Sequence, residues 1–474
     1  MISHLDDLKF EGGYPTAETT RKLYDQLDLQ RAAQAYLDFM PAISMQALLD
    51  MHPRDHGVSE TGGMIVYTEP GEGRSKDIGL TYNTESMYAS ASVDLKQTGP
   101  AVIEVPPNVL GVINDGFFLY LADLGNAGPD RGKGGKYLLL PPGYEGDVPE
   151  GYFVFRSSTW RNWVMARGFE QDTGRGEAAL AYYRAHFKVY PLGEGVHQPS
   201  VVSASFKPSD STFARDMRYF ERLHQMVQYE PLSAFTPEQL GLLHALGIVK
   251  GAPFQPDERM RRILSDGVRL GDGMAKAIMF ASRDPEARVY PDRHWERVFI
   301  GGYKFERDGA RLLDARTLWH YGAIVVTPAM EAKMVGVGSQ YLTAYKDASG
   351  AYLDGGQNYR LRLPTGIPAK NFWSVTVYDT ETRSLLQNGQ PKPSISSAFD
   401  QPEVNPDGSV DIFFGPAAPE GKEKNLSLIH ISEPTRARRR TGSGRCPDRA
   451  TSCGSACTAR WSPSSSRPGD PTTS

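Results

Sequence analysis

Residues 372–379 read FWSVTVYD, a run of eight residues rich in β-branched and aromatic side chains. This pattern is typical of a β-strand, in which successive side chains point to opposite faces. Upstream, residues 359–363 alternate Tyr or Leu with Arg, which predicts a second strand. Downstream, residues 405–408 read NPDG and lead into SVDIFFG, a hairpin signal because Asp-Gly accommodates the positive φ angles of a tight turn. We therefore predict a β-sandwich domain over residues 298–425.

Similar patterns recur in residues 57–195. Short runs rich in β-branched and aromatic residues are separated by Gly and Pro, as in MIVYTEP (64–70), AVIEVPP (101–107) and KYLLLPPG (136–143). Their length and spacing are those of an antiparallel sandwich or barrel. We predict a first β-sandwich domain here, closing with a short helix.

Helical patterns occupy two further segments. In residues 1–56, Thr16 can cap a helix that Pro41 should end. In residues 196–297, Pro237 is suited to the first turn of a helix, and an amphipathic run follows Asp257. The chain is thus expected to be mainly β with helical insertions, an α+β fold of two antiparallel β-sandwich domains linked by a helical segment.

Composition excludes several classes of protein. Of 474 residues, 40% are hydrophobic and 23% charged, which is typical of globular proteins. No run approaches 18 apolar residues, so we predict no membrane span. The opening residues show no basic segment followed by an apolar one, which favours a cytoplasmic location; a periplasmic or secreted location would require a natural start upstream.

Residues 426–474 differ from the rest of the chain. They contain all three cysteines, with 8 basic and 3 acidic residues, which leaves 44 basic and 53 acidic residues in residues 1–425, a net charge of −9. Such an acidic body argues against nucleic-acid binding. A basic Cys-containing segment could bind metal or nucleic acid, but the Cys spacings match no zinc pattern.

The first residues of this tail, LSLIHISEPTR (426–436), resemble the translation of a transposase adapter used in sequencing libraries. Read one register over, the codons of residues 441–463 permit NWLRTVPGPGYVVRLRLYGPLEP, which has a Gly-Pro turn and strand-like alternation. We therefore predict an adapter insertion followed by a frameshift, and an artefactual disordered tail. Resequencing the gene across Asn425 tests this, because an uninterrupted frame would exclude it.

Several blocks together resemble a pair of bacterial families. GPDRGKGGKYLLLPPGY (128–144), with LTYNTESMY (80–88), is similar to the domain of unknown function 1254. NPDGSVDIFFGPAAPEGKEKN (405–425), with FWSVTVYDTETRSLLQN (372–388), is similar to the domain of unknown function 1214. The resemblance spans roughly residues 14–425 and implies a mostly β architecture of two sandwiches, without implying a reaction.

The Gly-rich loop GPDRGKGGK (128–136) is the first candidate site. It lacks the spacing of a Walker loop and precedes a strand, so nucleotide binding is disfavoured. A structural turn explains the glycines, and a substrate-contacting loop that uses Arg131 is the alternative.

A second candidate is RSSTWRNW (156–163), which follows a strand. Arg156 and Trp160 could bind a sugar, an anion or an aromatic ligand at a pocket mouth. The alternative is a buried pair of Trp side chains with Arg at the rim.

A third candidate follows the 372–379 strand, where Asp379 and Arg383 are predicted catalytic residues. Tyr82 and Asn83, with Arg131, Arg156 and Trp160, are predicted to bind substrate. His52 and His56 have helical i, i+4 spacing, but Pro53 between them disfavours a helix and no third ligand is identifiable, so no metal is predicted. The identity of any cofactor stays open.

Two function classes follow, and the sequence leaves open whether the chain is an enzyme. One is a hydrolase or lyase acting on a small polar or carbohydrate-like substrate in an interdomain cleft. The other is a non-catalytic β-sandwich protein that binds a small ligand or carbohydrate. A small-molecule ligand and a homo-oligomer are both compatible with the sequence. The residues include no Cys nucleophile before residue 426 and no G-x-S-x-G motif.

Overall fold

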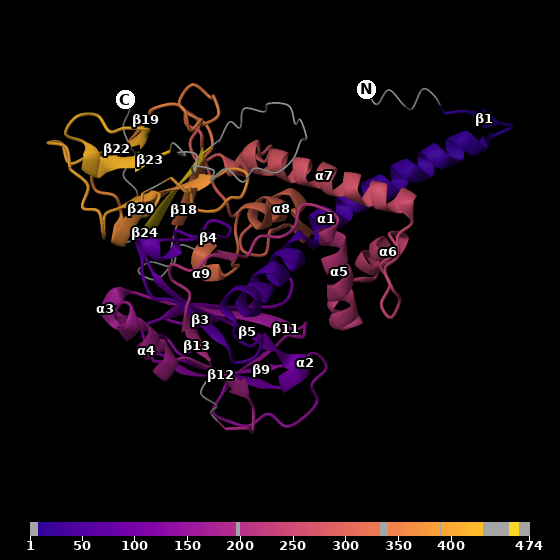
Figure 1. The fold of residues 1–474 in the computed structure, drawn as a ribbon, viewed down its shortest axis with the longest axis horizontal. Helices are drawn as coiled ribbons and strands as arrows, with labels where there is room; N and C mark the ends of the chain where they lie inside the picture. Colours follow the sequence, from indigo (N-terminus) through magenta and orange to yellow (C-terminus); the bar gives the residue numbers. More distant parts are fainter. Residues whose placement is uncertain (1–7, 196–199, 332–339, 389, 430–454, 464–474) are drawn as a thin grey trace, which may run out of the picture.

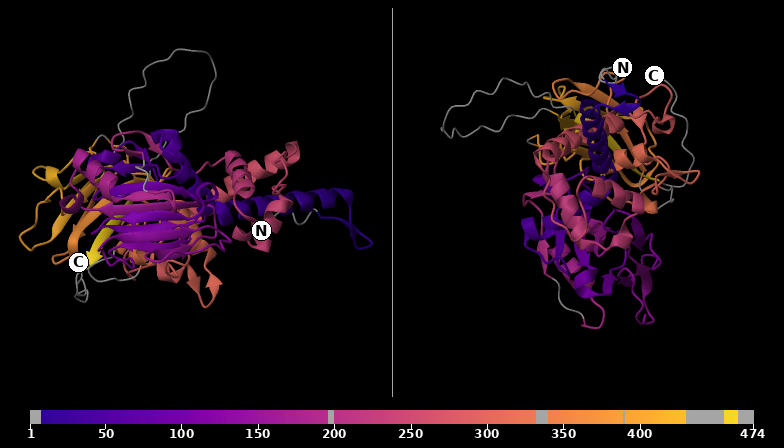
Figure 2. Two further views of the ribbon diagram at one scale, coloured as in Figure 1. Left: turned by 90° about the horizontal axis from the view of Figure 1, so that it is seen from below. Right: turned by 90° about the vertical axis from the view of Figure 1, so that its right-hand side faces the viewer.

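The computed structural model describes residues 8–195, 200–331, 340–388, 390–429 and 455–463. Two β units lie next to each other, and a long helix, α1 (Ala17–His56), runs from a projecting end toward them (Figures 1 and 2). The predicted mainly β chain with helical insertions is confirmed as a mixed α+β fold with largely antiparallel sheets. The division into two sandwich domains with the boundaries given above remains a prediction.

The first β unit contains two sheets that share one core. The larger sheet holds, in spatial order, β13 (Val201–Ser203), β3 (Met64–Tyr67), β5 (Met87–Asp94), β11 (Arg161–Gly168), β7 (Leu110–Asn114) and β8 (Tyr120–Gly125). The smaller holds β10 (Phe153–Arg156), β9 (Gly135–Leu140), β6 (Ala101–Val105) and β12 (Lys188–Pro191). α4 (Glu177–His186) packs on the same core and confirms the closing helix.

The larger sheet is buried on both faces. On β3, Met64 and Val66 belong to the core shared by the two sheets, whereas Ile65 and Tyr67 belong to the core on the opposite side. On β11, Trp163 likewise belongs to that opposite core. This alternation is the period of two expected of a strand. The predicted strands at MIVYTEP, AVIEVPP and KYLLLPPG are confirmed as β3, β6 and β9, whereas β7 and β11 were not predicted.

The second β unit contains a five-stranded and a three-stranded sheet. The five-stranded sheet holds β15 (Trp295–Glu296), β18 (Gln340–Ala344), β24 (Ser455–Pro463), β20 (Ala369–Asp379) and β21 (Ser394–Ser396). The three-stranded sheet holds β19 (Tyr359–Leu363), β22 (Val410–Gly415) and β23 (Leu426–Leu428). The strands predicted around residues 359–363 and 372–379 are therefore confirmed.

The predicted hairpin at residues 405–408 is wrong, although the turn itself forms. Gly408 has a φ of +81°, and the amide of Asn405 donates to the carbonyl of Ser409 at 2.8 Å. However, β22 pairs with β19 and β23 rather than with a strand just before the turn. The apolar side chains of β19 and β22 share one core, and this packing decides the pairing.

The described fold continues past the predicted boundary at residue 425. β23 begins at Leu426, and Ser427 in this strand is buried. The backbone of β24 lies between β18 and β20 and pairs with both in antiparallel register. Residues 430–454 and 464–474 lie outside the described residues, and the insertion with a frameshift stays a prediction.

Helix α1 is longer than predicted. Thr16 caps it as expected by accepting from the amide of Thr19, but the helix passes through Pro41 and Pro53 and ends only before Gly57, whose φ is +67°. A proline inside a helix costs about 3 kcal/mol. Nearly all residues from 39 to 49 are buried, and the packing of this segment offsets that cost. The prediction that Pro41 ends the helix is wrong.

Several helices from the middle of the chain pack around α1. They are α5 (Arg218–Tyr229), α6 (Pro237–Ala245), α7 (Glu258–Phe280) and α8 (Leu313–Gly322). Pro237 occupies the first turn of α6, and α7 follows Asp257, as predicted. Asp257 also caps α7 by accepting from the amide of Met260 at 2.7 Å. No helix in the described part of the chain has the length and apolar character needed to cross a bilayer.

Short elements complete the chain. They are β1 (Phe10–Glu11), β2 (Tyr14–Pro15), β4 (Asp77–Ile78), β14 (Ser209–Asp210), β16 (Glu306–Arg307), β17 (Ala310–Arg311), α2 (Leu95–Thr98), α3 (Glu170–Thr173), α9 (Pro328–Glu331), η1 (Gly71–Arg74), η2 (Leu232–Ala234), η3 (Pro285–Ala287) and η4 (Glu423–Asn425). One hydrophobic core joins α1, α5, α7, α8, the outer face of the larger sheet and residues of the second unit. This core surrounds the cavity described next.

Candidate functional site

A cavity of about 150 Å³ lies between the two β units. Its wall is formed by α1, by the outer face of the larger sheet in the first unit, by the ends of α7 and α8, and by β18 and β20 of the second unit. Most of the lining side chains are aliphatic or aromatic, among them Met51, Trp163, Met165, Phe280 and Trp319. The sheet contributes these residues because its strands alternate between two buried faces.

Arg74, the last residue of η1, is the most unusual polar residue of the wall. It is only 6% exposed, and its guanidinium carbon lies 3.7 Å from the ring centroid of Tyr67 and 4.3 and 4.6 Å from those of Tyr82 and Tyr88. No described residue accepts a hydrogen bond from Arg74 Nε. Three π faces thus surround a buried cation whose donor groups are not fully used.

Tyr82 and Asn83, both predicted substrate-binding residues, lie on the cavity wall, and the ring of Tyr82 packs on the guanidinium of Arg74. The Tyr82 hydroxyl is 2.6 Å from Ser211 Oγ, and burial raises the pKa of Tyr82 to about 12. Asn83 is 4% exposed; its Oδ1 accepts from the amide of Glu85 at 2.7 Å, whereas its Nδ2 donates to no described residue. Asn83 therefore presents an unused donor at the wall.

Ser90, another residue of the wall, pairs with the buried His52 of α1. Ser90 Oγ lies 2.8 Å from His52 Nε2 and accepts a hydrogen bond from Trp163 Nε1 at 2.7 Å. Burial lowers the pKa of His52 to about 3, with the charges of His56 and Arg161 adding to the effect, so the imidazole is neutral at neutral pH. No described residue contacts His52 Nδ1 through a hydrogen bond.

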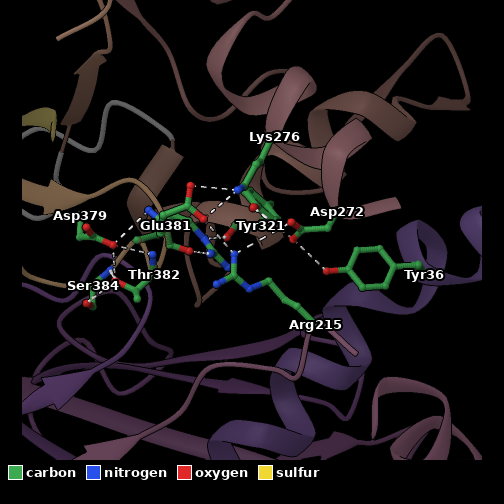
Figure 3. A network of polar contacts seen from close by, with 10 residues as sticks. Tyr36, Arg215, Asp272, Lys276, Tyr321, Asp379, Glu381, Thr382 and Ser384 are labelled. Atoms are coloured by element: carbon green, nitrogen blue, oxygen red, sulfur yellow. Dashed lines mark hydrogen bonds and ion pairs between the residues drawn. The ribbon is translucent and has the colours of Figure 1, made fainter. Parts of the chain in front are cut away.

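The predicted catalytic residues Asp379 and Arg383 also line the cavity, but their polar atoms hold the turn after β20 in place. Figure 3 shows Asp379 with its partners in this turn. Asp379 Oδ1 accepts from the amides of Glu381 and Thr382 at 3.0 and 2.7 Å. Arg383 Nε donates to the carbonyl of Tyr321 on α8 at 3.0 Å. These contacts give both residues a structural role, and their catalytic role stays a prediction.

The same network reaches the helices. Asp272 of α7 accepts from the hydroxyls of Tyr36 on α1 and Tyr321 on α8 at 3.3 and 3.2 Å (Figure 3). Lys276 of α7 pairs with Glu381 at 2.8 Å. The turn of the second β unit is thereby attached to three helices, which fixes one end of the cavity.

Asp123 of β8 lies on the wall near α9. It accepts a hydrogen bond from the hydroxyl of Thr327, and burial raises its pKa to about 6. A carboxyl group with a raised pKa in a cavity is a feature that also occurs in catalytic sites.

The three other predicted binding residues are not brought to the cavity. Arg131 is exposed in the Gly-rich loop, where Asp130 instead accepts from the amides of Gly125 and Gly134 at 2.8 and 3.0 Å. Arg156 is exposed and donates to the carbonyl of Tyr144 at 2.8 Å. These contacts are those of surface turns.

Trp160 is half-buried and packs against the core between the two sheets of the first unit. Its amide donates to Glu230 at 2.6 Å, and burial raises the pKa of Glu230 to about 7. Trp160 therefore does not line the cavity, whereas Trp163, from the same segment, does.

No group of three or more metal-ligating side chains occurs among the residues that the structure describes. His52 and His56 do lie on one helix, because Pro53 does not interrupt α1. Burial lowers the pKa of both, but no third ligand joins them in the described part of the chain.

Two family profiles match the chain. Residues 65–191 match the family described as protein of unknown function (DUF1254), and residues 338–432 match the family described as protein of unknown function (DUF1214). The N-terminal part of the chain thus matches the first family and the C-terminal part matches the second, as the sequence resemblance implied.

Among solved structures, the chain is similar to the VPA0106 protein from Vibrio parahaemolyticus, with a TM-score of 0.51 and 16% identity over 92% of this chain and 95% of that one. An uncharacterized protein from Burkholderia cenocepacia gives a TM-score of 0.39 and 13% identity over 95% of this chain and 94% of that one. No curated protein matches the chain. The first similarity concerns the fold alone, and no biochemical function is assigned by any of these matches.

Proposed function

We propose that the chain binds a small, largely apolar molecule in the cavity between its two β units. The observation that carries this proposal is the wall itself, which gathers aliphatic and aromatic side chains from both units and from α1, α7 and α8. Protein interiors normally contain few spaces larger than one water molecule. Concave, mainly apolar cavities with a few polar groups are the usual form of small-molecule sites.

This lining favours an apolar ligand over the polar or carbohydrate-like substrate that the sequence suggested. A sugar needs hydrogen-bond partners along most of its surface, because a buried hydroxyl without a partner costs free energy. Most of the exposed surface of this wall is apolar, and several of its polar groups, such as those of Tyr82 and Asp379, already hold neighbouring residues. A flat aromatic body would instead contact Trp163 and Trp319.

The test reduces the free volume of the cavity by enlarging one of its side chains. Ala323→Phe adds an aromatic ring at a small residue of the wall, and we expect the affinity for a neutral probe, 1-naphthamide, to fall at least about tenfold. Ala351→Phe is the matched control, because Ala351 is exposed and away from the cavity, and it should bind as the unmodified chain does. Binding is measured by isothermal titration calorimetry, with circular dichroism to confirm folding.

Two outcomes contradict the proposal. The unmodified chain could show no binding of 1-naphthamide, or a folded Ala323→Phe variant could bind it as well as the control does. Either result would mean that the cavity does not receive small apolar molecules.

Hydrolysis is the second candidate function, and the contact between Ser90 Oγ and His52 Nε2 is the observation that favours it. In such a mechanism Ser90 would be the nucleophile and His52 the base. The low pKa of His52 weakens it as a base, because burial disfavours the imidazolium that must form. For this reason we place binding first.

A fluorophosphonate probe distinguishes the two functions. If the protein only binds its ligand, we expect no adduct at Ser90. If it is a hydrolase, an Oγ–P bond forms as fluoride leaves and the proton passes to His52. Ser90→Ala then abolishes labelling, whereas Ser92→Ala, which changes another buried serine of the same strand, does not.

The pH dependence of labelling gives a further prediction for a hydrolase. Because the pKa of His52 is about 3, the labelling rate should not fall as pH is lowered from about 8 to about 5. Mass spectrometry of the intact protein reports the adduct.

A further inference from the structure

We infer that the ligand of this cavity carries an anionic group, such as a carboxylate, which contacts Arg74. The inference rests on the proposed function, because it concerns the same cavity, and it adds the chemical class of the ligand: an apolar body with one negatively charged end.

Arg74 carries a buried charge with an unused hydrogen-bond donor. A guanidinium has five N–H donors in its plane, and a buried charge is stable only when it is paired or hydrogen-bonded. The rings of Tyr67, Tyr82 and Tyr88 pack around the guanidinium, yet Nε has no acceptor among the described residues. Contact with π faces leaves the N–H groups in the plane of the guanidinium without acceptors. A carboxylate can accept two parallel hydrogen bonds from such N–H groups.

A further unused donor lines the same cavity. Asn83 follows Tyr82, whose ring packs on the guanidinium of Arg74, and Asn83 Nδ2 donates to no described residue. The hydroxyl of Tyr67 instead interacts with Ser209 and with Asp77, which does not line the cavity. Arg74 and Asn83 therefore offer the hydrogen-bond donors that an oxyanion requires.

The acids near Arg74 have other partners. Asp77 does not line the cavity, and its Oδ1 accepts from Ser209 at 2.8 Å. Burial raises the pKa of Asp77 to about 6 despite the opposing charge of Arg74, so Asp77 is ionised at neutral pH, but it leaves Arg74 Nε without an acceptor. On the wall itself, Glu85 accepts from the hydroxyl of Thr84 at 2.7 Å. Asp123 and Asp379, two further carboxylates of the wall, accept from Thr327 and Thr382. These acids are thus engaged, whereas Arg74 Nε has no acceptor among the described residues.

The arginine of the predicted catalytic pair differs in this respect. Arg383 is also buried, but its Nε and Nη1 donate to the carbonyls of Tyr321 and Glu381. Its hydrogen bonds are made within the protein, so it does not need an anion. Arg74 is therefore the residue that we assign to the charged end of the ligand.

The experiment compares two probes that share a naphthalene body and differ in charge, 1-naphthoate and 1-naphthamide. Arg74→Gln should weaken the binding of 1-naphthoate at least about tenfold and that of 1-naphthamide less than about threefold. Arg74→Lys keeps the charge and should retain part of the preference for the anion. Arg156→Gln removes an exposed arginine away from the cavity and should change neither affinity.

Asn83→Asp provides a second variant in case Arg74→Gln does not fold. It keeps the acceptor for the amide of Glu85 and replaces a donor with a negative charge, so it should weaken 1-naphthoate selectively. Equal affinities of the folded variants and the unmodified chain for 1-naphthoate, with 1-naphthamide still bound, would overturn the inference and leave the proposed function intact. Failure of both probes to bind the unmodified chain would instead contradict the proposed function.

Discussion

Arg161→Met is expected to lower the free energy of unfolding by about 3–5 kcal/mol, the usual effect of removing one partner from a buried ion pair. Arg161 is 9% exposed, and its Nη2 lies 3.1 Å from Asp50 Oδ1 and 3.3 Å from Glu60 Oε1. Its Nη1 donates to Gln46 Oε1, which is also buried. The substitution leaves Gln46 without this donor and Asp50 with Arg222 as its remaining cation. These contacts attach β11 to α1.

Urea unfolding followed by circular dichroism measures the change. Arg156→Met is the matched control from the same segment; because Arg156 is exposed, its loss should change the free energy of unfolding by less than about 0.5 kcal/mol. If the two variants unfold at the same urea concentration, the network of Arg161 does not stabilise the fold as we describe.

These two arginines also show where sequence reasoning reached its limit. From RSSTWRNW (156–163) the sequence analysis chose Arg156 and Trp160, whereas Trp163 is the residue of this segment that lines the cavity. The binding role of Arg156 and Trp160 stays a prediction. Burial of Arg161 depends on Asp50 and Gln46, which lie more than 100 residues away on α1. No local pattern reports such partners, and the segment was not recognised as strand β11.

Strand-end reasoning selected two residues of the wall. Asp379 and Arg383 lie at and beyond the end of β20, so their chain positions already placed them at the edge of a sheet. Tyr82 and Asn83, which belong to the block that resembles the domain of unknown function 1254, also lie on the wall. Their hydrogen-bond partners could not be predicted from the sequence, because the contact of Arg383 with α8 joins residues that are distant in the chain. Arg74 was missed for the same reason: only the fold brings Tyr67, Tyr82 and Tyr88 around it.

Local rules failed most clearly at proline. The rule that Pro41 ends a helix is sound for an isolated segment, but here the apolar residues on both sides of Pro41 enter the core between the β units. For the same reason the contact between His52 and Ser90 was not predicted, because it requires a helix that continues to His56. A sequence signal existed in the apolar run PAISMQALL (41–49), which supplies helical faces after the proline.

The second large effect is expected in the contact between α1 and α7. Gly267→Leu should lower the free energy of unfolding by about 3 kcal/mol or more, at the upper end of the range for overpacked cores. A Cβ at Gly267 would lie 2.4 Å from Ala32 Cβ and 3.2 Å from the carbonyl carbon of Ala32, so the obstacle includes backbone. Both residues are buried, and α1 cannot move away without separating from the core that lines the cavity.

The same helix supplies the control. Gly273 has no atom within 4 Å of the position of an added Cβ, so Gly273→Leu should leave stability unchanged or raise it by up to about 1 kcal/mol, because leucine favours a helix more than glycine does. Thermal and urea unfolding of the two variants are compared with the unmodified chain. An equal response to the two substitutions would show that helix propensity alone decides, and that close packing of α7 on α1 is not what holds the helices together. A selective loss at Gly267 would instead locate the stabilising contact where α1 enters the shared core.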